Sequence, residues 1–359
     1  MLDQDPVAPV RERTALTDFP VGLADVYRAH ELIRASLPDT PMVNHPLLRE
    51  RMGFETFVKL ENTHSIGSFK IRGGLFLLAN MTDSDRRRGL VTATRGNHGQ
   101  SIACAAGLYN ARCTIFVPRG NNAHKNAAMT ALGADVIEQG HDFDEAWELA
   151  EAFATQTDAR LVHPAREPDL IAGVATAAIE MIEQAGDPLD AVFVPVGGGS
   201  IATGIGLVFR ALSPSTRVYG VQAENAPAMH HAWQTGEERP FAVTDTIADG
   251  LAVRVPVDFT LNVMRELLAG MLLVSEEEIQ DAIRCYANTI HQMAEGGAAA
   301  ALAGAMKMRS EFRGKRVGVV LTGGNIETET LLHALSGRQP MHIPQAMPMY
   351  PIDDLSYGY

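Results

Sequence analysis

The sequence predicts an α/β protein with mainly parallel strands, because two patterns recur along its 359 residues. In the first pattern, a short apolar run, a glycine-containing loop and a helical segment follow one another several times, which is typical of parallel sheets. In the second, most apolar runs are continuous, which indicates strands that helices cover on both faces. The predicted strands span residues 58–60, 90–93, 113–117, 135–137, 191–196, 218–221 and 317–321.

The clearest predicted helix begins at Ser275. Its hydroxyl can cap the first turn, while the side chain of Glu278 returns a bond to the backbone of the capping residue. Apolar residues follow at helical spacing and predict a packing face made of Ile279, Ile283, Tyr286, Ile290 and Met293.

Composition restricts the class of protein and its partners. A hydrophobic content of 46% over this length supports a substantial core, in two domains or one large α/β unit, and excludes a disordered chain. The formal charge of -13 is unfavourable for binding nucleic acid or an anionic membrane, so any bound phosphate must be held locally. Neither an apolar run long enough to span a bilayer nor a secretory leader is visible, and we expect a cytoplasmic protein.

The three cysteines, Cys104, Cys113 and Cys285, lack CxxC spacing. An odd number of cysteines without that spacing argues against a disulfide framework and against a zinc site. We therefore expect buried thiols that pack as small apolar groups.

Three glycine-containing loops, 95–100, 197–200 and 322–325, each follow a predicted strand and are expected to open a helix. Loops at the carboxyl ends of parallel strands converge on one crevice, where ligands bind. The loop 197–200 suits a phosphate, because its glycines let backbone N–H groups approach closely and the next helix points its positive end at the site. Taken alone, this loop also fits a loose dinucleotide site or tight helix packing.

The stretch KLENTHSIGSFKIRGG at 59–74 resembles the lysine motif of the fold-type-II pyridoxal-phosphate (PLP) family, which contains serine/threonine dehydratases and serine racemase. Further family motifs follow in the same order: GNH at 96–98, GGGS at 197–200, ADGLAV at 248–253, EGGA at 295–298 and TGGN at 322–325. The resemblance covers about residues 20 to 335. It implies a tryptophan synthase β-like fold with two open, twisted, mostly parallel sheets flanked by helices.

The resemblance also implies a domain division. A large PLP-binding domain would comprise 20–52 and 156–335, and a small domain 53–155. An N-terminal arm, 1–19, and a tail, 336–359, would lie at the periphery, where oligomer contacts are one use for them. No regulatory domain is expected, and a homodimer is.

The resemblance assigns Lys70 the central role, because a lysine can form a Schiff base with an aldehyde cofactor and its freed amine then becomes a base. Phe69 is expected to pack against the pyridine ring, and Asn97 to bond the 3-hydroxyl. The phosphate would be held by Gly197, Gly198, Gly199 and Ser200, the last in place of the family's usual glycine. Thr322 would meet the pyridine nitrogen as a neutral hydroxyl, which favours elimination over transamination.

The residues expected to bind the substrate are Ser65, Gly67, Arg95, Gly96, His98 and Glu295. The first two, with the backbone around Asn97 and His98, would hold the α-carboxylate. Glu295 would contact the substrate hydroxyl or amine, or else only cap a helix.

Departures from the family pattern refine these expectations. Gln222 and Ala228 replace the acidic pair that binds a divalent cation in racemase-like members, so no metal is expected there. Arg95 stands where relatives carry Ser or Ala, and a guanidinium cannot exchange a proton at neutral pH. We therefore expect no racemase activity, with Arg95 either gripping a substrate carboxylate or pairing with a structural acid.

The predicted function is a PLP-dependent dehydratase, or ammonia-lyase, that converts a small L-3-hydroxy amino acid to a 2-oxo acid and ammonia by β-elimination. L-threonine and L-serine are the favoured substrates, with threo-3-hydroxyaspartate and phenylserine as alternatives. An amino-acid racemase, a non-catalytic PLP-binding protein and a nucleotide-dependent oxidoreductase are the competing classes.

Overall fold

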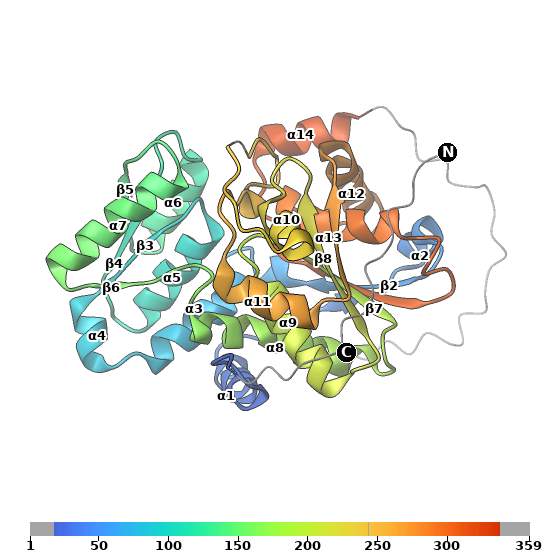
Figure 1. The fold of residues 1–359 in the computed structure, drawn as a ribbon, viewed down its shortest axis with the longest axis horizontal. Coiled ribbons are helices and arrows are strands. Elements are labelled where there is room, and N and C mark those ends of the chain that lie inside the picture. The colour runs from blue at the N-terminus through green and yellow to red at the C-terminus, as the bar shows by residue number, and fades with distance from the viewer. Residues whose placement is uncertain (1–17, 243, 338–359) are drawn as a thin grey trace.

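The structure, a computed structural model, describes residues 18–242 and 244–337 and confirms the α/β class with two sheets (Figure 1). The larger sheet has the strand order β1-β2-β10-β7-β8-β9, and all its neighbours are parallel except β1 and β2. Its strands are β1 (Met42–Val43), β2 (Glu55–Leu60), β7 (Ala191–Pro195), β8 (Arg217–Ala223), β9 (Gly270–Val274) and β10 (Arg316–Leu321).

The smaller sheet is fully parallel, with the strand order β5-β4-β3-β6. Its strands are β3 (Leu90–Ala93), β4 (Cys113–Val117), β5 (Asp135–Glu138) and β6 (Arg160–Leu161). Each predicted strand is therefore present. Three strands were not predicted: β1 and β6, which have two residues each, and β9, whose run of Met and Leu is as typical of a helix as of a strand.

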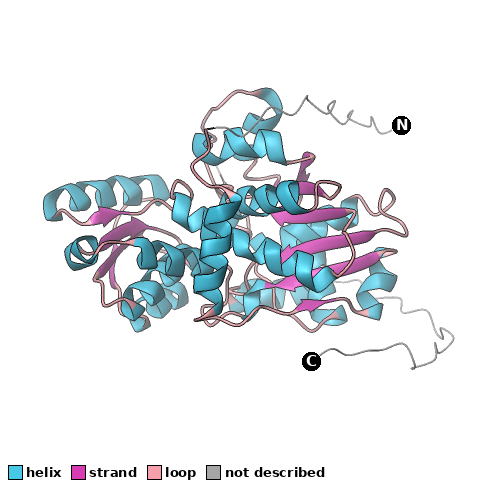
Figure 2. Cartoon of the chain, turned by 90° about the horizontal axis from the view of Figure 1, so that it is seen from below, coloured by secondary structure: helices cyan, strands magenta, loops and turns pink. Residues whose placement is uncertain are grey.

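Helices cover both sheets, as the two views in Figures 1 and 2 show. The α-helices are α1 (Leu23–Arg34), α2 (Pro46–Met52), α3 (Lys70–Asn80), α4 (Asp83–Arg88), α5 (Asn97–Leu108), α6 (Ala123–Ala131), α7 (Phe143–Thr157), α8 (Pro168–Ala185), α9 (Ser200–Leu212), α10 (Ala228–Thr235), α11 (Asp258–Leu267), α12 (Glu276–Thr289), α13 (Gly296–Lys307) and α14 (Thr328–Ser336). Two short 3-10 helices are η1 (Glu61–Thr63) and η2 (Asp249–Leu251).

Strand β7 shows why its sequence is a continuous apolar run. Val192 and Val194 pack in the core with α8, α9 and α11, whereas Ala191 and Phe193 pack on the other face with α12 and α13. Successive side chains of a strand point to opposite faces, so a strand with two covered faces needs apolar residues at every position. The smaller sheet is built the same way, with α3, α5 and α6 on one face and α7 on the other.

The capping prediction at Ser275 is confirmed. Its hydroxyl accepts from the backbone N–H of Glu278 at 3.2 Å, and the Glu278 carboxylate accepts from the backbone N–H of Ser275 at 2.8 Å. The predicted packing face is buried except for Met293, which is 53% exposed. The inclusion of Met293 was wrong because α12 ends at Thr289, before the spacing reaches it.

Sheet membership differs from the predicted domain ranges at two strands. Strand β2, which those ranges gave to the small domain, pairs with β10 in the larger sheet. Strand β6, given to the large domain, pairs with β3 in the smaller sheet. The chain passes between the two units through η1 and α3, and α3 packs on both α5 and α8.

Among the described residues, no helix combines the length and the apolar character needed to cross a bilayer. The three cysteines are free thiols, of which Cys113 and Cys285 are buried and Cys104 is partly exposed. Most of the predicted N-terminal arm and C-terminal tail lies outside the described residues.

Candidate active site

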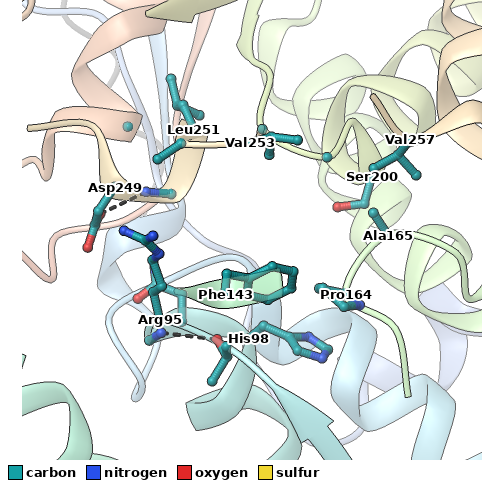
Figure 3. A pocket seen from close by; sticks show the side chains of 18 of the residues that line it. Arg95, His98, Phe143, Pro164, Ala165, Ser200, Asp249, Leu251, Val253 and Val257 are labelled. Carbon is teal, nitrogen blue, oxygen red and sulfur yellow. Dashed lines mark hydrogen bonds between the residues drawn. The ribbon is translucent and has the colours of Figure 1, made fainter. Parts of the chain in front are cut away.

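A cavity of about 710 Å³ has walls from both units (Figure 3). The carboxyl ends of β3, β7 and β10 line it, as expected for an open parallel sheet. In the view of Figure 3, Arg95 and Asp249 lie at one end and Ser200 with Ala165 at the other. The three glycine-containing loops thus meet, although the third does not open a helix directly, since α14 begins only at Thr328.

Lys70 is the first residue of α3, and its side chain enters this cavity. Its Nζ lies 3.3 Å from both the Ser200 hydroxyl and the Pro164 carbonyl oxygen, and 5.1 Å from the centre of the Phe69 ring. Burial lowers the pKa of this amine to about 8. Because neither contact is with a carboxylate, the amine can lose its proton far more easily than an exposed lysine.

The loop from Gly197 to Ser200 forms a cradle that side chains would fill. A Cβ at Gly197 would collide with the Gly250 carbonyl oxygen, and one at Gly198 would lie 2.8 Å from the Ala165 Cβ. Gly199 has a φ of +88°, in the left-handed region that favours glycine. The first turn of α9 begins here, where backbone N–H groups have no partner within the helix, so the loop can receive an anion.

Asn97 and His98 begin α5, and both line the cavity. The Thr92 hydroxyl donates to the Val162 carbonyl oxygen at 2.7 Å and lies 3.1 Å from His98 Nε2. Since the Thr92 hydroxyl donates its proton to the Val162 carbonyl, it can only accept from His98, whose Nε2 therefore carries a hydrogen. The buried Nδ1 of His98 has no hydrogen-bond partner among the described residues. Burial, with the Lys70 cation nearby, holds the pKa of His98 well below its usual range, so the ring is neutral.

Arg95 lines the cavity and is partly buried. Within residues 18–242 and 244–337 its guanidinium makes no hydrogen bond or ion pair, and its Nε is buried without a partner. The predicted alternative, in which Arg95 pairs with a structural acid, is therefore not observed among the described residues. A free guanidinium in a cavity can bind a carboxylate through two parallel hydrogen bonds.

Glu295 immediately precedes α13, but its side chain caps nothing. Its Oε1 accepts from Asn97 Nδ2 at 2.7 Å, and its buried Oε2 has no hydrogen-bond partner in the part of the chain that the structure describes. Burial and the nearby Asp249 carboxylate raise the pKa of Glu295 to about 7. The carboxyl group can therefore gain or lose a proton near neutral pH.

Several residues that line the cavity were not among those predicted from the sequence. Lys125 of α6 forms an ion pair with Asp249, across the two units. Helix α7 presents five residues to the cavity at helical spacing, namely Phe143, Asp144, Trp147, Glu148 and Glu151. Asp249 lay within a recognised motif and the α7 pattern was visible in the sequence, whereas nothing local distinguished Lys125.

Two of the predicted substrate-binding residues do not line the cavity. Ser65 is exposed, and the Gly67 carbonyl oxygen accepts a hydrogen bond from the backbone N–H of Gly324 at 2.9 Å. The other predicted residues do line it: Phe69, Lys70, Arg95, Gly96, Asn97, His98, Gly197, Gly198, Gly199, Ser200, Glu295 and Thr322.

Gln222 occupies the position where racemase-like members are expected to bind a divalent cation. It is buried, and its Oε1 accepts from the backbone N–H of His230 at 2.9 Å. A group with metal-ligand spacing occurs elsewhere among the described residues, at His30, Asp39 and Glu180. Both Glu180 oxygens there already accept hydrogen bonds from Arg72, and one also accepts from Lys59. Those cations neutralise the carboxylate that a metal ion would need.

Comparison with known proteins gives a consistent set of relatives. The model of the family described as pyridoxal-phosphate dependent enzyme matches residues 33–323. The chain is 35% identical to an L-threonine ammonia-lyase of Thermotoga maritima, over 87% of this chain and 77% of the relative. It is 32% identical to an L-threo-3-hydroxyaspartate ammonia-lyase of Saccharomyces cerevisiae, over 88% and 96%.

Solved structures agree with this. The processed form of threonine deaminase isoform 2 from Solanum lycopersicum matches with a TM-score of 0.81 and 28% identity, over 94% of this chain and all of that chain. Maize serine racemase matches with a TM-score of 0.82 and 26% identity, over 88% and 97%.

Proposed function

We propose, because the chain belongs to the family of pyridoxal-phosphate-dependent enzymes, that it is an ammonia-lyase acting on a small L-3-hydroxy amino acid. Its products would be a 2-oxo acid and ammonia, and L-threonine and L-serine are the first substrates to test. One observation carries the proposal above the others. A lysine with a lowered pKa, Lys70, lies within 3.3 Å of Ser200 in a loop shaped for a phosphate.

The residues that line the cavity fit pyridoxal phosphate. The cradle at 197–200 would hold its phosphate, and Lys70 would hold its aldehyde carbon. Phe69 would contact the ring, Asn97 its 3-oxygen and Thr322 its nitrogen. These roles rest on the family motif and are supported by the common cavity.

The cofactor, when bound, withdraws electrons from the α-carbon of an attached amino acid and so weakens the Cα–H bond. Lys70 then takes the α-proton on Nζ, for which a pKa of about 8 is suited near neutral pH. The hydroxyl on the β-carbon would then leave as water, with the proton that Lys70 Nζ took from the α-carbon. Thr322 offers a neutral hydroxyl rather than a carboxylate, which limits competing transamination.

A second candidate substrate is a 3-hydroxy amino acid with an acidic side chain. The Arg95 guanidinium, which has no partner among the described residues, favours it, because that group can bind a second carboxylate. Two relatives are named as L-threo-3-hydroxyaspartate ammonia-lyases. The homodimer and the cytoplasmic location remain predictions from the sequence.

The test is 2-oxo acid formation from L-serine, L-threonine, L-threo-3-hydroxyaspartate and phenylserine. In Lys70→Ala both the cofactor attachment and the base are lost, so we expect no turnover and no visible absorption band from lysine-bound cofactor. Lys307→Ala is the matched control, since Lys307 is exposed on α13, away from the cavity, and pairs with Glu278 and the Leu273 carbonyl oxygen. Full activity in Lys70→Ala would contradict the proposal.

A further inference from the structure

Asn97, Glu295 and Asn325 come from three separate parts of the chain and meet beside the cavity. Asn325 Nδ2 donates to the Ile66 carbonyl oxygen at 2.9 Å and to Asn97 Oδ1 at 2.8 Å. Asn97 Nδ2 in turn donates to Glu295 Oε1 at 2.7 Å. The three side chains thus form one directed chain of hydrogen bonds that begins at a backbone carbonyl.

The direction of this chain is fixed by chemistry. A backbone carbonyl can only accept, so the NH₂ group of Asn325, and not its oxygen, must face Ile66. The same NH₂ group then requires an acceptor on Asn97, which places Oδ1 toward Asn325 and Nδ2 toward Glu295. The orientation of the Asn97 amide therefore follows from a carbonyl whose identity is certain.

One N–H of Asn97 takes no part in this chain of hydrogen bonds. An amide NH₂ group has two hydrogens, and Glu295 accepts one of them. Asn97 is partly exposed and lines the cavity, so the second can serve a ligand. With the amide reversed, Asn97 would offer an oxygen to that ligand instead of a donor.

Two glycines leave the room that these side chains need. Gly67 has a φ of +69°, and a Cβ on it would lie 2.5 Å from Asn325 Oδ1. A Cβ on Gly323 would lie 2.5 Å from Glu295 Oε1. This gives Gly67 a different role from the substrate contact that the family motif suggested.

We infer that Asn325 and Glu295 are positioning residues, which hold the Asn97 amide with its donor toward the 3-oxygen of the cofactor and so stabilise that oxygen in its ionised form. The inference rests on the proposed function, in which Asn97 contacts this oxygen. A reversed or freely rotating amide would favour the protonated oxygen, because two acceptors facing each other need a proton between them.

The test uses the PLP-loaded protein without substrate. In Asn325→Asp, the side chain has lost the donors that fix the Asn97 amide. We expect the visible absorption band of the lysine-bound cofactor to weaken in favour of a near-ultraviolet band, and the dissociation constant for PLP to rise about tenfold. Asn325→Ala should shift both quantities in the same direction by less, since Asn97 is then free to rotate rather than driven to reverse.

Asn62→Asp is the matched control. Asn62 Nδ2 also donates to a backbone carbonyl, that of Met293, and to Gln292 Oε1, but Asn62 does not touch Asn97 or line the cavity. Its spectrum and PLP affinity should equal those of the wild type. Wild-type values in both Asn325 variants would overturn the inference, as would equal changes in Asn62→Asp.

Failure of the proposed function would be recognised separately. A wild-type protein that binds PLP through Lys70 but releases no ammonia would contradict the ammonia-lyase and leave the spectral comparison intact. Circular dichroism and thermal melting of each variant show whether it is folded. If Asn325→Asp is not folded, Asn325→Ser replaces it, because its hydroxyl can still donate to the Ile66 carbonyl oxygen. Asn325→Ser must then show the same spectral shift.

Discussion

Two clusters of charged side chains, one around Arg72 of α3 and the other at the cavity, differ in how completely they are paired. In the first, the Arg72 guanidinium binds Glu61 and Glu180, with four hydrogen bonds of 2.5 to 2.8 Å. Lys59 adds a further bond to Glu180 at 2.5 Å. These side chains are at most 1% exposed, and every charge has an opposite partner.

The second cluster lines the cavity and is incompletely paired. Lys125 and Asp249 form an ion pair, but Glu295 keeps one buried oxygen without a partner, and the Arg95 guanidinium has none in the described residues. Burying an unpaired charge is costly, so unpaired buried charges are typical of sites where a bound ligand supplies the missing partner. The paired cluster stabilises the fold, whereas the unpaired groups of the second cluster can bind a ligand.

Removing the guanidinium from the paired cluster should give the largest effect. Arg72→Ala leaves Glu61 and Glu180 buried without their main partner, and we expect the free energy of unfolding to fall by about 3 to 5 kcal/mol. Denaturant titration measures this. Arg160→Ala is the control, because its ion pair with Glu167 is partly exposed and should contribute less than about 1 kcal/mol. Equal losses in the two variants would remove the distinction.

The two clusters should also respond to pH in opposite directions. Although burial opposes it, the Arg72 guanidinium keeps the pKa of Glu61 well below its usual range, so this stabilisation is lost only as the pH falls below about 4.5. Burial raises the pKa of Glu295 to about 7, so its folded form binds a proton more tightly than the unfolded chain. Stability from Glu295 is therefore present below about pH 4.5 and lost as the pH rises through 7.

The size of the Glu295 effect follows from its pKa. A rise from 4.5 to about 7 corresponds to about 3 kcal/mol between those pH values, and Glu295→Gln should abolish this part of the slope. Unfolding free energies of both proteins at pH 5 and pH 7.5 provide the measurement. The same slope in wild type and variant would show that another group is responsible.

The smallest expected effect concerns Arg95, whose free guanidinium is the clearest mark of the incompletely paired cluster. If it grips a substrate carboxylate, Arg95→Ala should lower kcat/KM by one to two orders of magnitude, equivalent to about 1.5 to 3 kcal/mol, with little change in stability. The loss should be larger for L-threo-3-hydroxyaspartate than for L-serine if the carboxylate belongs to the side chain. Unchanged kinetics on every substrate would leave Arg95 without a role in binding.

Arg95 also bears on racemisation. A guanidinium stays protonated at neutral pH and cannot accept a proton, so the wild type should release ammonia without accumulating D-isomer. Chiral analysis of residual substrate measures this. D-isomer formed at a rate comparable to ammonia would contradict the prediction.

The sequence by itself determined the fold class and the lysine and glycine loop at the centre of the cavity. Continuous apolar runs predict strands covered on both faces, as β7 shows. Ser275 and Glu278 predict a helix start because capping depends on residues three apart in the chain. The ordered glycine and lysine motifs indicated Lys70 and the cradle at 197–200, since each motif is a local solution to binding one chemical group.

Only the tertiary structure decided how distant charges pair. Lys125 meets Asp249, and Asn97 meets Glu295 and Asn325, across separations of 124 to 228 residues, and no local pattern records such contacts. The same holds for sheet membership. Strand β2 belongs to the larger sheet through its pairing with β10, which lies over 250 residues later in the chain, so no local pattern could indicate it. Local propensity determines which helices and strands form, whereas contacts between distant residues depend on how those elements pack. That packing sets the pKa of Glu295 and the orientation of the Asn97 amide.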